Sequence, residues 1–160
     1  MPQTALTPET RFITGETWPV DSKVATDTAL KIGDLVGIDA ASGEVVPVSN
    51  FATEAEAAAV FAGISGQAKA AGVEQIRGNS RKNRVRIDTD GIWEIPCAVA
   101  VNTGQLLGFK LVDGKVATQE VVIAADATTA VGYCVLEKPA TETHVRIRLV
   151  SQNLGLLSAK

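Results

Sequence analysis

The side chains that could do chemistry are few and far apart in the sequence. The chain has 160 residues, with one histidine, His144, and two cysteines, Cys97 and Cys134. Nucleophilic catalysis needs a nucleophile, a base and an orienting group held together in space. His144 begins an alternating segment beside Arg146, which is typical of an ordinary residue at the end of a strand. The sequence therefore predicts no catalytic histidine.

The sequence also shows no clear carboxylate pair, phosphate-binding loop or metal site. The candidates for a general acid–base pair are Glu16, Asp34, Asp39 and Glu94. Nothing in their spacing indicates that two of them converge, as a glycosidase-type pair must. One histidine and two distant cysteines match no metal site, and the Gly33 to Gly37 segment lacks the Gly-Lys-Ser/Thr of a phosphate-binding loop. We expect no enzymatic activity, cofactor or metal. A small hydrolase with an unassigned carboxylate site is the remaining enzyme hypothesis.

The one charge cluster is basic. It comprises Arg77, Arg81, Lys82, Arg84 and Arg86, with no acidic residue among them. Such a cluster can contact phosphates, but no aromatic side chains are interleaved for base stacking and the whole chain has a net charge of −3. We therefore expect no nucleic-acid partner. Arg77, Arg81 and Lys82 are predicted to face either an acidic protein partner or solvent.

Length and composition indicate one domain with an aliphatic core. Hydrophobic residues make up 46% of the chain and aromatic residues only 4%. No apolar stretch is long enough to span a bilayer, and no secretory signal is recognised near the N-terminus. We expect a protein made in the cytosol with no membrane partner. Cys97 and Cys134 fit no zinc spacing and are expected to be buried, free thiols.

A glycine-bounded phrase occurs twice in the chain. Residues 32–38 return as residues 103–109, and one constant shift aligns Gly33 with Gly104 and Leu35 with Leu106. Two copies are too few for a solenoid, which needs at least three repeats to bury a continuous core. We therefore predict one closed domain of two similar halves, about residues 29–88 and 100–150.

Turns and one helix divide the chain into short elements. Ser42-Gly43 is predicted to turn a hairpin within residues 24–48, and Asp113-Gly114 provides the positive-φ positions of a type I′ turn. The only predicted helix spans residues 52–60, where Thr53 and Glu56 have capping-box spacing. These elements predict a mostly β domain over residues 23–160, an antiparallel barrel or sandwich with one short helix.

Two alternating segments, residues 84–96 and 144–150, complete the predicted β structure. Asp90-Gly91 either turns a hairpin or marks a β-bulge, and we favour the bulge because the segment is short on each side. Residues 66–83 have no counterpart of equal length in the second half and are predicted to form a long excursion.

Residues 1–22 are predicted to form an extended arm. The segment carries three prolines and no helical or alternating period. Its apolar side chains Phe12, Ile13 and Trp18 are too sparse for a core and too apolar for a solvated tail. Two explanations stay open: these side chains bind a partner, or Phe12 and Trp18 fold back onto their own domain.

The order of turns and core positions resembles the small capsid decoration, or cement, proteins of tailed bacteriophages. The similar positions lie within residues 24–150: Gly-Asp-x-Val at 33–36, Phe-Ala-Gly-Ile at 61–64, Gly-Ile-Trp-Glu-Ile-Pro at 91–96, Val-Gly-Tyr at 131–133 and Val-x-Ile-x-Leu at 145–149. The motifs are turns and core residues, so the resemblance indicates the fold more directly than the function.

The resemblance implies a β-tulip type fold and a homotrimer. Such a trimer would sit on the capsid exterior of the virion, at three-fold or quasi-three-fold positions. Its N-terminal arm would contact the major capsid protein, with Phe12, Ile13 and Trp18 as anchors. The excursion at residues 66–83 fits this pattern poorly. The alternative hypothesis is therefore a head-fibre base or host-surface recognition module that binds through this loop.

Overall fold

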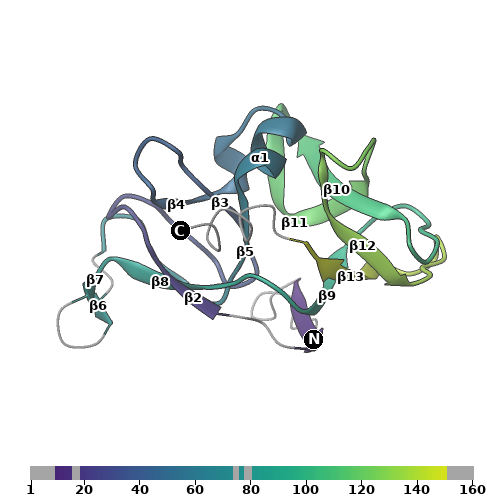
Figure 1. Ribbon diagram of the computed structural model, residues 1–160, viewed down its shortest axis with the longest axis horizontal. Coiled ribbons are helices and arrows are strands. Elements are labelled where there is room, and N and C mark those ends of the chain that lie inside the picture. The colour runs from purple at the N-terminus through teal and green to yellow at the C-terminus, as the bar shows by residue number, and fades with distance from the viewer. Residues whose placement is uncertain (1–9, 16–18, 74–75, 78–80, 151–160) are drawn as a thin grey trace, which may run out of the picture.

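A computed structural model describes residues 10–15, 19–73, 76–77 and 81–150, with the backbone alone at 76–77 and 81–82. Two antiparallel sheets lie side by side, with the helix α1, Glu54–Val60, above the region between them (Figure 1). The prediction of a mostly β, antiparallel fold with one short helix is confirmed. The two sheets stay open and do not close into a barrel. Within the described ranges, every helix is too short or too polar to span a bilayer.

The smaller sheet has five strands in the order β2-β8-β5-β3-β4. Their bounds are β2 Pro19–Lys23, β8 Arg84–Asp88, β5 Phe61–Ser65, β3 Leu35–Ile38 and β4 Val45–Pro47. A 3₁₀ turn, Val48–Asn50, follows β4. A separate small hairpin pairs β6, Ile76–Arg77, with β7, Arg81–Lys82.

The larger sheet has six strands in the order β1-β9-β13-β12-β10-β11. Their bounds are β1 Arg11–Thr14, β9 Ile92–Pro96, β13 His144–Leu149, β12 Ala130–Leu136, β10 Leu106–Val112 and β11 Lys115–Ile123. Without β1, this order repeats that of the smaller sheet, since β9, β13, β12, β10 and β11 take the places of β2, β8, β5, β3 and β4. The two similar halves therefore share one strand arrangement, which begins earlier in each half than the predicted bounds.

Each half also has its own apolar centre, and the two centres correspond residue by residue. In the first half the buried cluster is Val24, Leu30, Val36, Val45, Ala62, Val85 and Ile87. The equivalent buried residues of the second half are Ile95, Val101, Leu107, Val116, Val131, Val145 and Ile147. The second set belongs to a larger cluster that also joins the halves, in which the rings of Phe61 and Phe109 meet edge to face at 5.6 Å.

A buried lysine occupies the same place in each half. Lys69 pairs with Leu30 and Lys138 pairs with Val101 in equivalent short bridges. The Lys69 ammonium donates hydrogen bonds to three backbone carbonyls, those of Thr26, Thr28 and Ala70, at 2.6–3.2 Å. The Lys138 ammonium donates to the carbonyls of Val99 and Pro139, at 2.9 and 3.2 Å. Both charges are thus satisfied by backbone oxygens rather than by carboxylates.

The predicted local elements are confirmed where the signal is a turn or a cap. Asp113 and Gly114 have φ values of 51° and 74°, as a type I′ turn between β10 and β11 requires. The Thr53 side chain accepts a hydrogen bond from the backbone N–H of Glu56 at 3.2 Å and caps α1. Gly43, with φ 69°, lies in the turn between β3 and β4.

Asp90-Gly91 forms neither a hairpin nor a bulge within one strand. Strand β8, which precedes it, lies in the five-stranded sheet, and β9, which follows it, lies in the six-stranded sheet. Gly91 has φ 106°, a conformation that glycine adopts most easily. The favoured bulge prediction is therefore wrong, because this dipeptide is where the chain passes from one half to the other.

The predicted arm is partly built into the sheets. Strand β1 pairs with β9, and β2 pairs with β8 along its whole length, from Pro19 opposite Asp88 to Lys23 opposite Arg84. Residues 11–14 and 19–22 of the predicted arm are thus strands of the two sheets. The rest of the predicted arm, residues 1–9 and 16–18, lies outside the described residues.

The predicted excursion at residues 66–83 begins as part of the repeat. Lys69 pairs with Leu30, and the Gly72 N–H donates to the Thr26 carbonyl at 2.8 Å. Because Lys138 makes the same pairing in the second half, residues around Lys69 do have a counterpart. The excess length therefore begins after Gly72 and contains the small β6–β7 hairpin.

Candidate partner-binding surface

Strand β1 forms one edge of the larger sheet and carries two of the three predicted anchors. The Phe12 ring packs edge to face on Trp93, with ring centroids 5.3 Å apart, yet 44% of Phe12 stays exposed. Ile13 is half-buried, and Trp18 lies outside the described residues. Phe12 thus partly folds back onto its own domain and still offers apolar surface to a partner.

An ion network ties β1 to the outer face of the larger sheet. The Glu94 carboxylate accepts hydrogen bonds from the guanidinium groups of Arg11 on β1 and Arg146 on β13. Burial opposes ionisation of Glu94, but the hydrogen bonds and charges of the two arginines outweigh it and lower the pKa of Glu94 below its ordinary value. The carboxylate therefore holds three strands together at one level of the sheet.

Replacing Glu94 by Gln is expected to lower the free energy of unfolding by about 1 kcal/mol at neutral pH. Because the folded-state pKa is lowered, this contribution is present above the unfolded pKa, about 4.3, and is lost as the pH falls through the folded value. Urea unfolding of wild type and Glu94→Gln should show a gap at pH 7 that shrinks below about pH 4. Glu137→Gln, at an exposed site, is the matched control. A gap that persists unchanged at about pH 3 would contradict the assignment.

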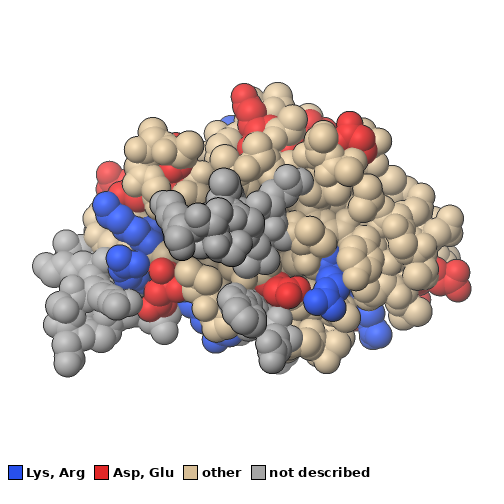
Figure 2. Space-filling view, viewed as in Figure 1, with Lys and Arg blue, Asp and Glu red and all other residues tan. Residues whose placement is uncertain are grey.

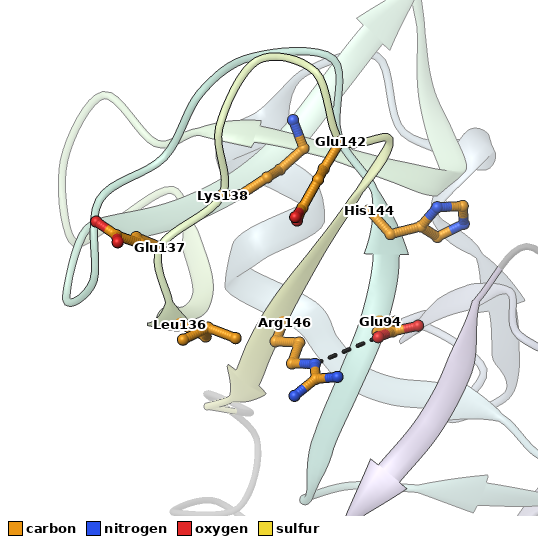
Figure 3. Close-up of a pocket in the computed structure, with 7 residues that line it drawn as sticks. All are labelled: Glu94, Leu136, Glu137, Lys138, Glu142, His144 and Arg146. Atoms are coloured by element: carbon orange, nitrogen blue, oxygen red, sulfur yellow. Dashed lines mark hydrogen bonds and ion pairs between the residues drawn. The ribbon is translucent and has the colours of Figure 1, made fainter.

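A cleft of ≈ 290 Å³ lies beside this network, between β9, β13 and the loop after β12 (Figure 3). Its lining residues are Glu94, Leu136, Glu137, Lys138, Glu142, His144 and Arg146. Figure 3 shows His144 and Glu137 pointing away from each other. The Thr143 hydroxyl lies 2.8 Å from Nδ1 of His144, but these are consecutive residues at the start of β13. This arrangement gives the cleft no assembled nucleophile, base and orienting group.

The other candidate carboxylates lie apart and make structural contacts. Asp34 accepts hydrogen bonds from the Lys31 N–H and the Gln119 amide, both at 2.9 Å, and so joins the two halves. Asp39, in the β3–β4 turn, accepts from the Ser42 hydroxyl at 2.7 Å, and this bond lowers the pKa of Asp39. Glu16 lies outside the described residues. Each described carboxylate of this set therefore has a structural partner.

Cysteine and metal chemistry find no support in the described ranges. Cys97 and Cys134 are both free and buried, as predicted. Burial raises the pKa of the Cys134 thiol, which disfavours the reactive thiolate. No group of three or more His, Cys, Asp or Glu side chains in the described part of the chain could hold a metal ion.

The basic cluster begins on the small hairpin. In its backbone ladder Arg77 lies opposite Arg81, and Lys82 opposite Ile76, while the side chains of these residues are outside what the structure describes. On the neighbouring strand Arg86 forms an ion pair with Asp88 at 2.9 Å. Figure 2 shows Lys and Arg interspersed with Asp and Glu over the visible face, so charge alone does not mark a binding surface there.

Sequence reasoning missed a row of exposed side chains on the outer face of the larger sheet. Across β10, β12 and β13 the directly opposite residues form the Tyr133 row, defined as Leu106, Tyr133 and Arg148. Leu106 and Tyr133 are 38% and 37% exposed. Tyrosine and arginine are enriched in protein interfaces and carry much of the binding energy there. The repeat gave no signal for this row, because it aligns these exposed positions with buried ones in the first half.

Comparison with known proteins identifies no family for this chain. No protein-family model matches the chain, and no curated protein matches its sequence.

Proposed function

We propose that this chain is a structural virion protein that decorates and stabilises a bacteriophage capsid. It would bind the outer surface as a trimer at three-fold or quasi-three-fold positions, with its N-terminal segment against the major capsid protein. The observation that carries the proposal is β1: an N-terminal strand at the edge of the larger sheet as far as the structure describes it, with Phe12 44% exposed beside the Arg11–Glu94 ion pair. The class of partner comes from the resemblance in turns and core positions.

The mechanism follows from differential binding and needs no turnover. A protein that contacts adjacent capsid subunits binds the assembled shell better than its separated parts, and it stabilises the shell by that difference in affinity. An exposed strand edge offers main-chain hydrogen bonds to a partner strand, and apolar side chains such as Phe12 fix the register. The rigid two-half domain would then hold this strand at a constant position.

The first test measures binding of the purified chain to expanded, undecorated capsids of the phage that encodes it. Binding in multiples of three and a raised disruption temperature of the capsids are expected. Phe12→Ser should weaken binding about tenfold or more while the domain stays folded, because Phe12 is half exposed. Quantitative co-sedimentation with capsids gives the affinity.

Val73→Ser is the matched control for this test. Val73 is 51% exposed and directly follows Gly72, whose N–H donates to the Thr26 carbonyl in the loop after β2. The control should bind capsids like wild type. Full binding by Phe12→Ser would refute the role of β1, and a wild-type chain that leaves the capsids undecorated would refute the capsid function itself.

A further inference from the structure

The exposed Tyr133 row has a buried duplicate in the first half. The equivalent residues across β3, β5 and β8 form the Ile64 row, defined as Leu35, Ile64 and Asp88. Both rows end beside equivalent strands, since Asp88 lies opposite Pro19 on β2 and Arg148 lies opposite Ile92 on β9. The two rows therefore occupy the same positions in the two copies of the repeat.

The two rows differ completely in burial. Leu35 and Ile64 are 0% exposed and belong to the core cluster that contains most of the second half's buried apolar residues. Their duplicates Leu106 and Tyr133 are more than one-third exposed, and the Arg148 side chain is 48% exposed. The first half thus packs its row against the second half, while the second half's own row is left uncovered.

This difference makes the internal contact between the halves heterologous. In a symmetric contact both duplicated rows would be buried against each other. Here the Ile64 row packs against core residues of the second half and not against the Tyr133 row. Each chain therefore keeps one row of this kind, the Tyr133 row, exposed. A heterologous contact that remains open can be repeated between molecules, and it generates a closed ring when the rotation between copies allows it.

We propose that the Tyr133 row is covered by a second copy of this chain in a head-to-tail contact. The duplicate row is already buried by β structure of the same protein, which is the precedent for this occupant. The next outward row provides a charged rim, in which Arg146 and Glu94 form an ion pair beside Leu136, itself 53% exposed. An apolar centre with a polar rim is the usual anatomy of a protein interface.

Electrostatics favours the same occupant. Arg148 makes one long ion pair, 3.6 Å from Asp90, and keeps nearly half its side chain exposed. The whole chain has a net charge of −3, so a neighbouring copy as a whole carries the sign of charge that attracts this arginine. This inference rests on the proposed function because both require the chain to self-associate. It adds the surface through which the copies meet.

The test compares the mass of wild type and variants in solution by light scattering and sedimentation equilibrium over a wide concentration range. Wild type is expected to form a closed multimer. Tyr133→Glu and Leu106→Glu should each raise the dissociation constant about 30-fold or more, because each places a charge in the centre of the contact. Leu111→Glu, at a 41% exposed residue near the β10–β11 turn, is the matched control and should associate like wild type.

Three results would overturn the inference: a wild-type chain that stays monomeric, a Tyr133→Glu variant that associates normally, or a Leu111→Glu control that dissociates equally. Thermal unfolding of each variant confirms that the domain is intact. Capsid binding is measured in a separate experiment. If the chain associates through the Tyr133 row but binds no capsid, the proposed function is refuted and the self-association inference stands. If Tyr133→Glu associates normally but no longer binds capsids, the row contacts the shell and the second copy is excluded as its cover.

Discussion

Replacing Gly132 by Ala is expected to lower the free energy of unfolding by about 3 kcal/mol or more. A Cβ atom at this position would lie 2.1 Å from the carbonyl oxygen of Arg148 and 2.9 Å from the side chain of Ile147. The Arg148 carbonyl belongs to β13, which pairs with β12 at this point, so it cannot move without disturbing the strand pairing. The melting temperature should fall by about 6–12 °C for a chain of this size.

The repeat supplies a second variant and an internal control for this prediction. A Cβ at Gly63, the equivalent glycine of the first half, would lie 2.2 Å from the Asp88 carbonyl oxygen, so Gly63→Ala should be destabilising to a similar extent. Gly104 has φ 87° but open space around its Cβ position, so Gly104→Ala should cost only about 1 kcal/mol through backbone strain. Equal melting temperatures for Gly132→Ala and Gly104→Ala would show that backbone contact is not the cause.

Replacing Lys69 or Lys138 by Met is the second change with a large expected effect, about 2–4 kcal/mol of unfolding free energy. Methionine keeps most of the aliphatic stem but removes the ammonium group, so buried carbonyls lose their donor. Lys69→Met should be the more damaging of the two, because Lys69 serves three carbonyls and Lys138 serves two. Urea unfolding of each variant measures the effect.

Lys110→Met is the matched control for the buried lysines. Lys110 forms an ion pair with Glu120 between β10 and β11, and both side chains are about one-third exposed. Such pairs contribute at most about 1 kcal/mol. If Lys69→Met cost no more than Lys110→Met, the buried ammonium groups would have no special part in holding the loops of each half.

The parts of the fold that sequence reasoning predicted are those encoded by neighbouring residues. Asp113-Gly114 specifies its turn because two consecutive residues must adopt positive φ. Thr53 and Glu56 specify the start of α1 because the capping bond spans only three residues. The repeat was visible for the same reason, since each copy carries its own turns and strands.

The parts that were missed depend on residues distant in the sequence. Asp90-Gly91 resembles a hairpin turn or bulge locally, and only the sheet assignment of β8 and β9 shows that it links the two halves. Lysine is rarely buried, so Lys69 and Lys138 read as surface residues until their carbonyl partners are known. Their equal positions in the two halves were the one available signal.

The binding surface was predictable only in part. Phe12 was identified because an aromatic residue in a proline-containing segment needs a contact, but its packing on Trp93 depends on a strand pairing that spans about half of the chain. The repeat aligns Leu106 with Leu35 and Tyr133 with Ile64, but in the structure the first-half residues are buried and their duplicates are exposed. Exposure depends on how the halves pack, which the repeat alone does not determine.

The pairing of β1 with β9 has a consequence for how the chain folds during synthesis. Arg11 and its partner Glu94 are separated by 83 positions, so the first strand cannot pair until the second half has begun to leave the ribosome. Strands β2 to β8 can meet earlier, but Leu35 and Ile64 then still lack the second half that buries them. Of the described strands, β1 is thus made first and placed among the last, and closing this long loop slows folding.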